Sequence, residues 1–180
     1  MFIEHTIETA PAASRRLMEA TARPRGYVPA AVARLATSPH LLEGFLKLSA
    51  LFEATTLDPL ARETVILTMA TRNRCHICVA MHTAKLLQLD APADLVEALR
   101  ASQPLPEPRL EAIRTFTLAV LASAGAVEDE ALQAFLAYGY TRQNALEVVL
   151  GIGTYTMSTL ANRLTGAPPD PALEPHAWAA

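Results

Sequence analysis

Apolar residues recur along most of the chain at the three- and four-residue spacing of α-helices, and breaks rich in proline or glycine separate the stretches. Ser38–Pro39 and Asp58–Pro59 each combine an N-cap residue with a first-turn proline, which is typical of a helix start. The pattern predicts a short helical segment at 29–37 and helices over residues 13–22, 40–54, 60–73, 75–89, 93–101, 109–124, 128–139 and 141–164.

Strand signals are weak. The best strand candidate is residues 64–70, TVILTMA, but this stretch does not alternate apolar and polar residues and lies between helix starts. The sequence therefore predicts an all-α, single-domain helical bundle. We expect an N-terminal helical segment at 1–23, the main helical domain at 24–166, and an extended, proline-rich C-terminal tail at 167–180.

The segment 141–164 is apolar on nearly every side of its predicted helix. A helix of this kind is normally buried all round. In a chain of 180 residues, complete burial suggests that another subunit supplies part of the cover. We therefore expect a homo-oligomer, a trimer or a hexamer.

Composition narrows the possible functions. Hydrophobic residues make up 51% of the chain and charged residues 18%, and the net charge is −3. This balance predicts a globular protein and gives no sign of nucleic-acid or anionic-membrane binding. Charges interrupt every apolar stretch before membrane-spanning length, and no secretory signal is evident. We therefore expect a cytoplasmic protein.

The chain has only two cysteines, Cys75 and Cys78, and in a reducing compartment such a pair is more often redox-active or metal-binding than structural. His82 falls on the same face of the predicted helix and could act as a general base for Cys78. Cys75 lies at the helix start, where the dipole and the nearby Arg72 and Arg74 would lower a thiol pKa.

Glu63 belongs to the preceding predicted helix. If the two helices pack as an antiparallel pair, Glu63 and His82 lie at similar distances from the connection and can approach each other. The carboxylate would then orient the imidazole and stabilise its charged form. Taken alone, Glu63 is more simply a solvated residue near a helix start.

Other interpretations remain open. A zinc site could use both cysteines, His82 and His76, but His76 points away from their stripe, and a closed site needs a fourth ligand. A c-type haem would need a histidine where Val79 stands. The cysteines could also be inert core residues. Tyr155 and Asn162 could line a pocket, although mutual hydrogen bonding is the simpler interpretation. No metal and no cofactor is predicted.

The stretch RETVILTMATRNRCHICVAMHTAKL, with Glu63, Cys75, Cys78 and His82 at its key positions, resembles the core of the alkylhydroperoxidase-D-like, or carboxymuconolactone decarboxylase-like, family. The likeness extends over residues 24–172. It implies an oligomeric helical thiol peroxidase that reduces hydroperoxides. Cys78 would be peroxidatic, Cys75 resolving, and Glu63 with His82 a proton relay, while a dithiol or a lipoylated protein would return the electrons.

One position departs from the family pattern. Alkylhydroperoxidase-D proteins have a second histidine directly before the second cysteine, whereas this chain has Ile77 there and His76 one place earlier. The physics of the helix end favours Cys75 as nucleophile, whereas the family pattern and His82 favour Cys78. The alternative functions are a non-enzymatic redox sensor and a cofactor-free decarboxylase or lactone-processing enzyme. A pocket lined with cationic groups would favour the last of these.

Overall fold

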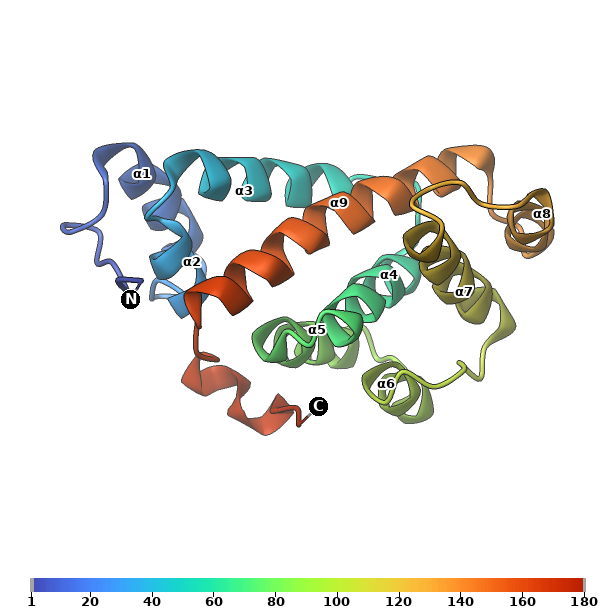
Figure 1. Cartoon of the computed structure of the whole chain (residues 1–180). Helices are drawn as coiled ribbons and strands as arrows, with labels where there is room; N and C mark the ends of the chain where they lie inside the picture. The colour runs from blue at the N-terminus through green and yellow to red at the C-terminus, as the bar shows by residue number, and fades with distance from the viewer. Residues whose placement is uncertain (1, 180) are drawn as a thin grey trace.

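The computed structural model describes residues 2–179, which form nine α-helices and one 3₁₀ helix and contain no strand (Figure 1). The all-α, single-domain prediction is therefore confirmed. The elements are α1 (Ala12–Ala22), α2 (Ala30–Leu35), α3 (Pro39–Glu53), α4 (Pro59–Arg72), α5 (His76–Gln88), α6 (Ala93–Arg100), α7 (Pro108–Ala122), α8 (Asp129–Ala137), α9 (Arg142–Thr165) and the 3₁₀ helix η1 (Pro171–His176).

The predicted helix starts form as the sequence indicates. The Ser38 hydroxyl accepts a hydrogen bond from the Leu41 N–H, and the Asp58 carboxylate accepts one from the Ala61 N–H, so each satisfies a free donor in a first turn. The long helix α9 begins with a reciprocal cap between Thr141 and Asn144. The stretch 64–70, which was the best strand candidate, lies in the middle of α4.

Helix α4 is the centre of the molecule and packs against α5, α6, α7 and α9. Every residue from 63 to 71 is buried, so this helix is covered on all sides. Figure 1 shows α5 beside α4, and the long α9 lying between α4 and α3. The α1, α2 and α3 helices form a smaller cluster at one end, built around Met18 and Leu42.

Within the single chain α9 is covered on one side only, whereas the complete burial expected for it included cover from another subunit. Leu146 and Leu164 are each 74% exposed, and Leu160 and Val149 are about half exposed. The opposite face of α9 packs on α3 and α4. Because α9 lies over the edge of the bundle while α4 lies at its centre, only α4 has neighbours all round. The exposed leucines recur at helical spacing and form one apolar stripe along α9.

The C-terminal tail is not extended as predicted. Pro171–His176 forms η1, which lies against α5. The Asp170 carboxylate accepts a hydrogen bond from the Ala30 N–H, and the Trp178 indole N–H donates to the Arg100 carbonyl. Contacts at both ends therefore hold the tail in place, and composition alone gave no sign of them. No helix within residues 2–179 combines the length and apolarity needed to cross a membrane.

Candidate active site

The connection between α4 and α5 places both cysteines in the core. Arg74 adopts a left-handed backbone conformation with φ 53°, which lets the chain reverse within a few residues. The Cys75 N–H then donates back to the Ala70 carbonyl, and Cys75 becomes the N-cap of α5. Cys78 follows one turn into the helix. As a result, each cysteine is only 1% exposed, although both lie at the end of a helix.

The two cysteines are free thiols in direct contact. Their sulfur atoms are 2.9 Å apart and share a hydrogen bond, which the Cys78 thiol donates when Cys75 is ionised. The side-chain amide of Asn162, on α9, donates to the Cys78 sulfur at 3.4 Å. The contact between the sulfur atoms means that a small movement suffices to join them in a disulfide.

The two thiols have different pKa values, and Cys75 is the more acidic of the two. The pKa of Cys75 is lowered to about 7, chiefly by the hydrogen bond from the Cys78 thiol and further by the Cys78 N–H, Asn162 and the charge of Arg163. The pKa of Cys78 is raised because its proton is shared with Cys75, because it is buried, and because a Cys75 thiolate repels a second charge. The resting negative charge therefore belongs on Cys75.

Glu63 and His82 form a buried pair, as the antiparallel arrangement of α4 and α5 predicts. Their side chains approach to 2.7 Å between Glu63 Oε2 and His82 Nδ1, and the two residues are 2% and 7% exposed. Because a carboxylate can only accept, Nδ1 carries the proton. The other ring nitrogen, Nε2, is buried and has no hydrogen-bond partner among the described residues. The Tyr155 ring packs edge-on against the imidazole.

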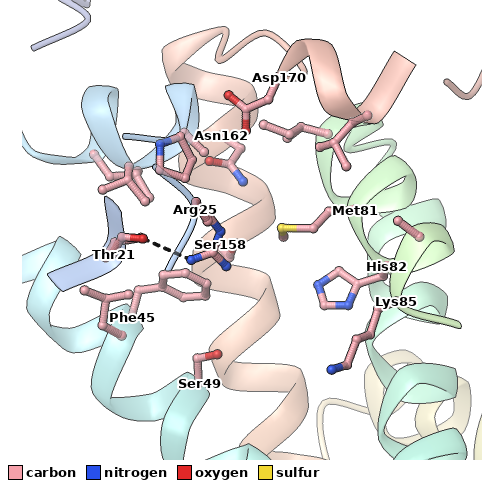
Figure 2. A pocket seen from close by; sticks show the side chains of 18 of the residues that line it. Thr21, Arg25, Phe45, Ser49, Met81, His82, Lys85, Ser158, Asn162 and Asp170 are labelled. Carbon is pink, nitrogen blue, oxygen red and sulfur yellow. Dashed lines mark hydrogen bonds between the residues drawn. The ribbon is translucent and has the colours of Figure 1, made fainter. Parts of the chain in front are cut away.

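His82 lines a cavity of about 530 Å³, which we call the His82 cavity (Figure 2). Met81, His82 and Lys85 reach into it from α5, opposite Asn162 of α9 and Phe45 of α3 (Figure 2). Its walls also include residues from α1, the α1–α2 connection, α2, α9 and the tail, namely Thr21, Arg25, Tyr27, Leu35, Tyr155, Ser158, Asp170 and Leu173. The cavity therefore combines apolar and aromatic walls with a buried acid–base pair.

Two cations at the His82 cavity have no carboxylate partner among the described residues. They are Arg25 and Lys85, and Arg25 donates only to the backbone carbonyl of Thr21, a bond visible in Figure 2. The acidic residues on the same walls are occupied elsewhere. Glu53 pairs with Arg62, Glu63 with His82, and Asp170 accepts the Ala30 N–H.

A second cavity, of about 350 Å³, opens onto Cys75, and we call it the Cys75 cavity. It is lined by Arg74, Cys75, His76, Ile77, Asn162, Arg163, Gly166 and Ala167. Only Ile77 and Asn162 line both cavities, so these two side chains stand between them. Cys78 lines neither cavity and lies behind the Asn162 amide.

The structure brings the four predicted site residues together as two contacting pairs, Cys75 with Cys78 and Glu63 with His82. Within residues 2–179 no hydrogen bond joins Tyr155 to Asn162; instead both line the His82 cavity, which was the other interpretation, and the Asn162 amide donates to Cys78. The cation that lowers the pKa of Cys75 is Arg163, whereas the sequence suggested Arg72 and Arg74.

Sequence reasoning missed Ser158 and Arg163. Both lie on α9, where Tyr155, Ser158 and Asn162 follow one another at three- and four-residue spacing along one face. That polar stripe within an apolar helix was a usable signal for Ser158. For Arg163 the sequence offered none, because its contact with the loop before Cys75 joins residues 90 positions apart.

Within residues 2–179, no group of three or more histidine, cysteine, aspartate or glutamate side chains is placed to bind a metal ion. His76 is turned away from the cysteines. Its Nδ1–H donates to the Trp178 carbonyl at 2.8 Å, and its ring packs against the Trp178 indole.

Part of the chain matches a known protein family. Residues 39–114, which contain all four predicted site residues, match the Carboxymuconolactone decarboxylase family. No curated protein is significantly similar to the chain in sequence.

Several solved structures share the fold. An uncharacterized peroxidase-related protein from Ralstonia eutropha JMP134, described as an alkylhydroperoxidase AhpD core, superposes with a TM-score of 0.83 at 20% identity, covering 96% of this chain and 93% of that one. A peroxidase-related protein from Silicibacter sp. TM1040 gives 0.78 at 18% identity, with 95% and 92% covered. The debrominase Bmp8 in complex with 2,3,4-tribromopyrrole gives 0.76 at 13% identity, with 98% and 95% covered.

The family match and the shared fold test the family resemblance that the spacing of the glutamate, cysteines and histidine predicted. The solved structures establish the fold over nearly the whole chain, and the family match covers the segment that carries the site. The resemblance is therefore confirmed: residues 39–114 match the carboxymuconolactone decarboxylase family, and the chain shares its fold with the solved structure described as an alkylhydroperoxidase AhpD core.

Proposed function

We propose that the protein is a thiol peroxidase that reduces organic hydroperoxides with Cys75 and Cys78. In this proposal His82 protonates the leaving oxygen, and Glu63 stabilises the protonated imidazole. The observation that carries the proposal is the buried Glu63–His82 pair with its unpartnered Nε2, because His82 lines the same cavity as the Asn162 side chain that contacts Cys78. A peroxide bond needs a thiolate attacker and a proton for its leaving oxygen, and the site supplies both.

The first chemical step uses the shared proton of the thiol pair. The Cys75 thiolate takes the Cys78 proton across the 2.9 Å contact. The Cys78 thiolate then attacks the terminal peroxide oxygen, so that the O–O bond breaks and the sulfur becomes a sulfenic acid. The leaving alkoxide takes a proton from the protonated His82 at Nε2 and departs as an alcohol. The Glu63 carboxylate stabilises the imidazolium until that transfer.

The second step closes the disulfide. The Cys75 sulfur attacks the sulfenic sulfur of Cys78, and the hydroxyl group leaves with the Cys75 proton as water. The two thiols are thereby oxidised by two electrons and one hydroperoxide is reduced to an alcohol and water. A dithiol or a lipoylated protein returns the electrons, which completes the cycle.

Three features support an organic substrate. A volume of about 530 Å³ is that of a site for a drug-sized molecule and far exceeds hydrogen peroxide. Phe45 and Tyr155 give the cavity aromatic walls. The debrominase neighbour holds a brominated pyrrole in the same overall fold, which supports a flat apolar body for the ligand here.

The test is peroxide consumption with a panel of dithiol donors, combined with trapping of the sulfenic acid. We expect Cys75→Ser to accumulate a sulfenic acid on Cys78 that reacts with dimedone, and Cys78→Ser to accumulate none. The reverse labelling would make Cys75 the attacker. An absence of turnover with every donor, despite reversible formation of the disulfide, would favour a redox sensor instead.

One observation favours a second candidate. Arg25 and Lys85 give the His82 cavity two cations without carboxylate partners among the described residues, which suits an organic anion. A cofactor-free decarboxylase or lactone-processing enzyme would use them to hold a carboxylate while His82 moves a proton. The double variant Cys75→Ser/Cys78→Ser separates the candidates, because it abolishes peroxidase turnover but spares proton-transfer chemistry on a lactone acid.

A further inference from the structure

The two cavities adjoin different parts of the site around the thiol pair. The His82 cavity holds the acid–base pair, whereas the Cys75 cavity reaches the cysteine with the lower pKa from the start of α5 and the end of α9. Because only Ile77 and Asn162 line both, a molecule bound in one cavity leaves the other open.

The Cys75 cavity is positively charged. Arg74 and Arg163 line it, and no carboxylate does. The Arg163 guanidinium donates to the Asn73 carbonyl, and Arg74 makes no side-chain hydrogen bond or ion pair within residues 2–179. Both guanidinium charges are therefore available to a ligand that approaches the Cys75 sulfur.

We propose that the Cys75 cavity is the entrance for the reductant, and that it selects a dithiol carrying negative charge beside its thiols, while the hydroperoxide uses the His82 cavity. The proposal rests on the dithiol-driven cycle proposed above. Two guanidinium groups raise the local concentration of an anion and draw it toward Cys75, the cysteine that lines this cavity.

The reduction balances as two exchange steps. One donor thiolate attacks Cys75 Sγ and forms a mixed disulfide, and the electron pair of the Cys75–Cys78 bond goes to Cys78, which takes up a proton. The second donor thiolate then attacks the donor's own bonded sulfur and expels Cys75 as a thiolate. The donor becomes a cyclic disulfide, and the protein regains two thiols.

The pKa shifts of the two cysteines favour this order, in which Cys78 leaves first and Cys75 second. Two of the three causes that raise the pKa of Cys78 involve Cys75, and both disappear while Cys75 is bonded to the donor. The hydrogen bonds from Asn162 and Ser158 remain to stabilise the Cys78 thiolate as it leaves. In the second step the leaving group is Cys75, whose pKa of about 7 makes it the better leaving thiolate of the two.

The experiment measures reduction alone. The full-length protein is oxidised with diamide, which requires no peroxide, and its reduction is followed with 2,3-dimercaptopropanesulfonate and with 2,3-dimercaptopropanol, which differ chiefly in charge. We expect the sulfonate to react faster at low salt, and Arg74→Glu to cut the ratio of the two rates about three- to tenfold. Raising the salt to about 0.5 M should shrink the ratio in the same direction.

The matched control is Arg142→Glu. It makes the same charge change on the first residue of α9, about 32 Å along that helix from Arg163, and should leave the ratio unchanged. Arg163→Gln provides a second variant in the cavity. A second pair of donors, peptides with two cysteines flanked by glutamates or by lysines, tells whether the charge preference serves small dithiols or protein segments.

Two outcomes would overturn the proposal. One is a ratio near one in the unmodified protein with both donor pairs, and the other is an equal response of Arg74→Glu and Arg142→Glu. A charge preference that persists in a protein inactive toward hydroperoxides would leave this inference standing while the peroxidase proposal fails. A cysteine pair that diamide cannot oxidise to a disulfide would refute both.

Discussion

Replacing Glu63 with glutamine tests whether the buried carboxylate stabilises a protonated His82. The change keeps the shape of the side chain and leaves an amide oxygen that can still accept from Nδ1, so it removes the charge and little else. In the proposed mechanism Glu63 is a positioning residue, because it would act on the substrate only through the imidazole, from which its carboxylate is 2.7 Å away.

The expected magnitude follows from the geometry. Opposite charges centred about 4 Å apart attract by about 4 kcal/mol at an effective dielectric constant of 20. The hydrogen bond that glutamine retains offsets part of this loss and leaves about 2 to 3 kcal/mol. At 25 °C that corresponds to a roughly 30- to 150-fold slower proton delivery. The free energy of unfolding should change by less than about 1 kcal/mol, because removal of a buried charge also removes its desolvation cost.

The assay compares leaving groups. Single-turnover disulfide formation at pH 7 is measured with tert-butyl hydroperoxide, whose alkoxide needs a proton, and with a peracid, whose carboxylate leaves without one. Glu63→Gln should slow the first reaction strongly and the second little. Glu53→Gln is the matched control, since Glu53 lines the same cavity but pairs with Arg62. Equal slowing of both substrates would refute the relay and make Glu63 a structural residue.

Three further predictions concern the thiols, α9 and assembly. Alkylation of Cys75 should be half-maximal near pH 7, and Cys78→Ala should move that midpoint above pH 8, because the Cys78 thiol is the main cause of the lowered pKa. Gly151→Ala should lower the free energy of unfolding by about 1 to 3 kcal/mol, since its Cβ would meet an aromatic ring at 2.7 Å, whereas Gly153→Ala, with nothing within 4 Å, should not destabilise the protein. Light scattering should give a multiple of the monomer mass, which Leu146→Lys in the exposed stripe of α9 should reduce.

Features set by neighbouring residues could be predicted from the sequence. The helix starts at Ser38 and Asp58 depend on a cap and a proline within one turn. The contact of Cys75 with Cys78 follows from their three-residue spacing. The approach of Glu63 to His82 needed only that two helices joined by a short connection pack antiparallel.

Features that depend on distant segments could not be predicted. Asn162 reaches Cys78 from 84 positions away, and Arg163 influences Cys75 from a different helix. The tail forms η1 because Asp170 caps the start of α2 and Trp178 reaches the end of α6. In α9, apolar composition alone could not tell a centrally buried helix from one whose stripe of leucines faces outward.

In the proposed function, the chemistry and the substrate preference of this protein have different structural sources. Glu63, Cys75, Cys78 and His82 all lie on the α4–α5 hairpin, inside the segment that matches the family. Much of the wall of the His82 cavity comes instead from the segment 21–35, from α9 and from the tail, outside that segment of the family match. A change on those walls can therefore alter which molecule binds without moving the thiols or the acid–base pair. Exchanging the segment 21–35 or the tail with those of another member of this fold should accordingly change substrate preference while the pH dependence of Cys75 alkylation stays the same.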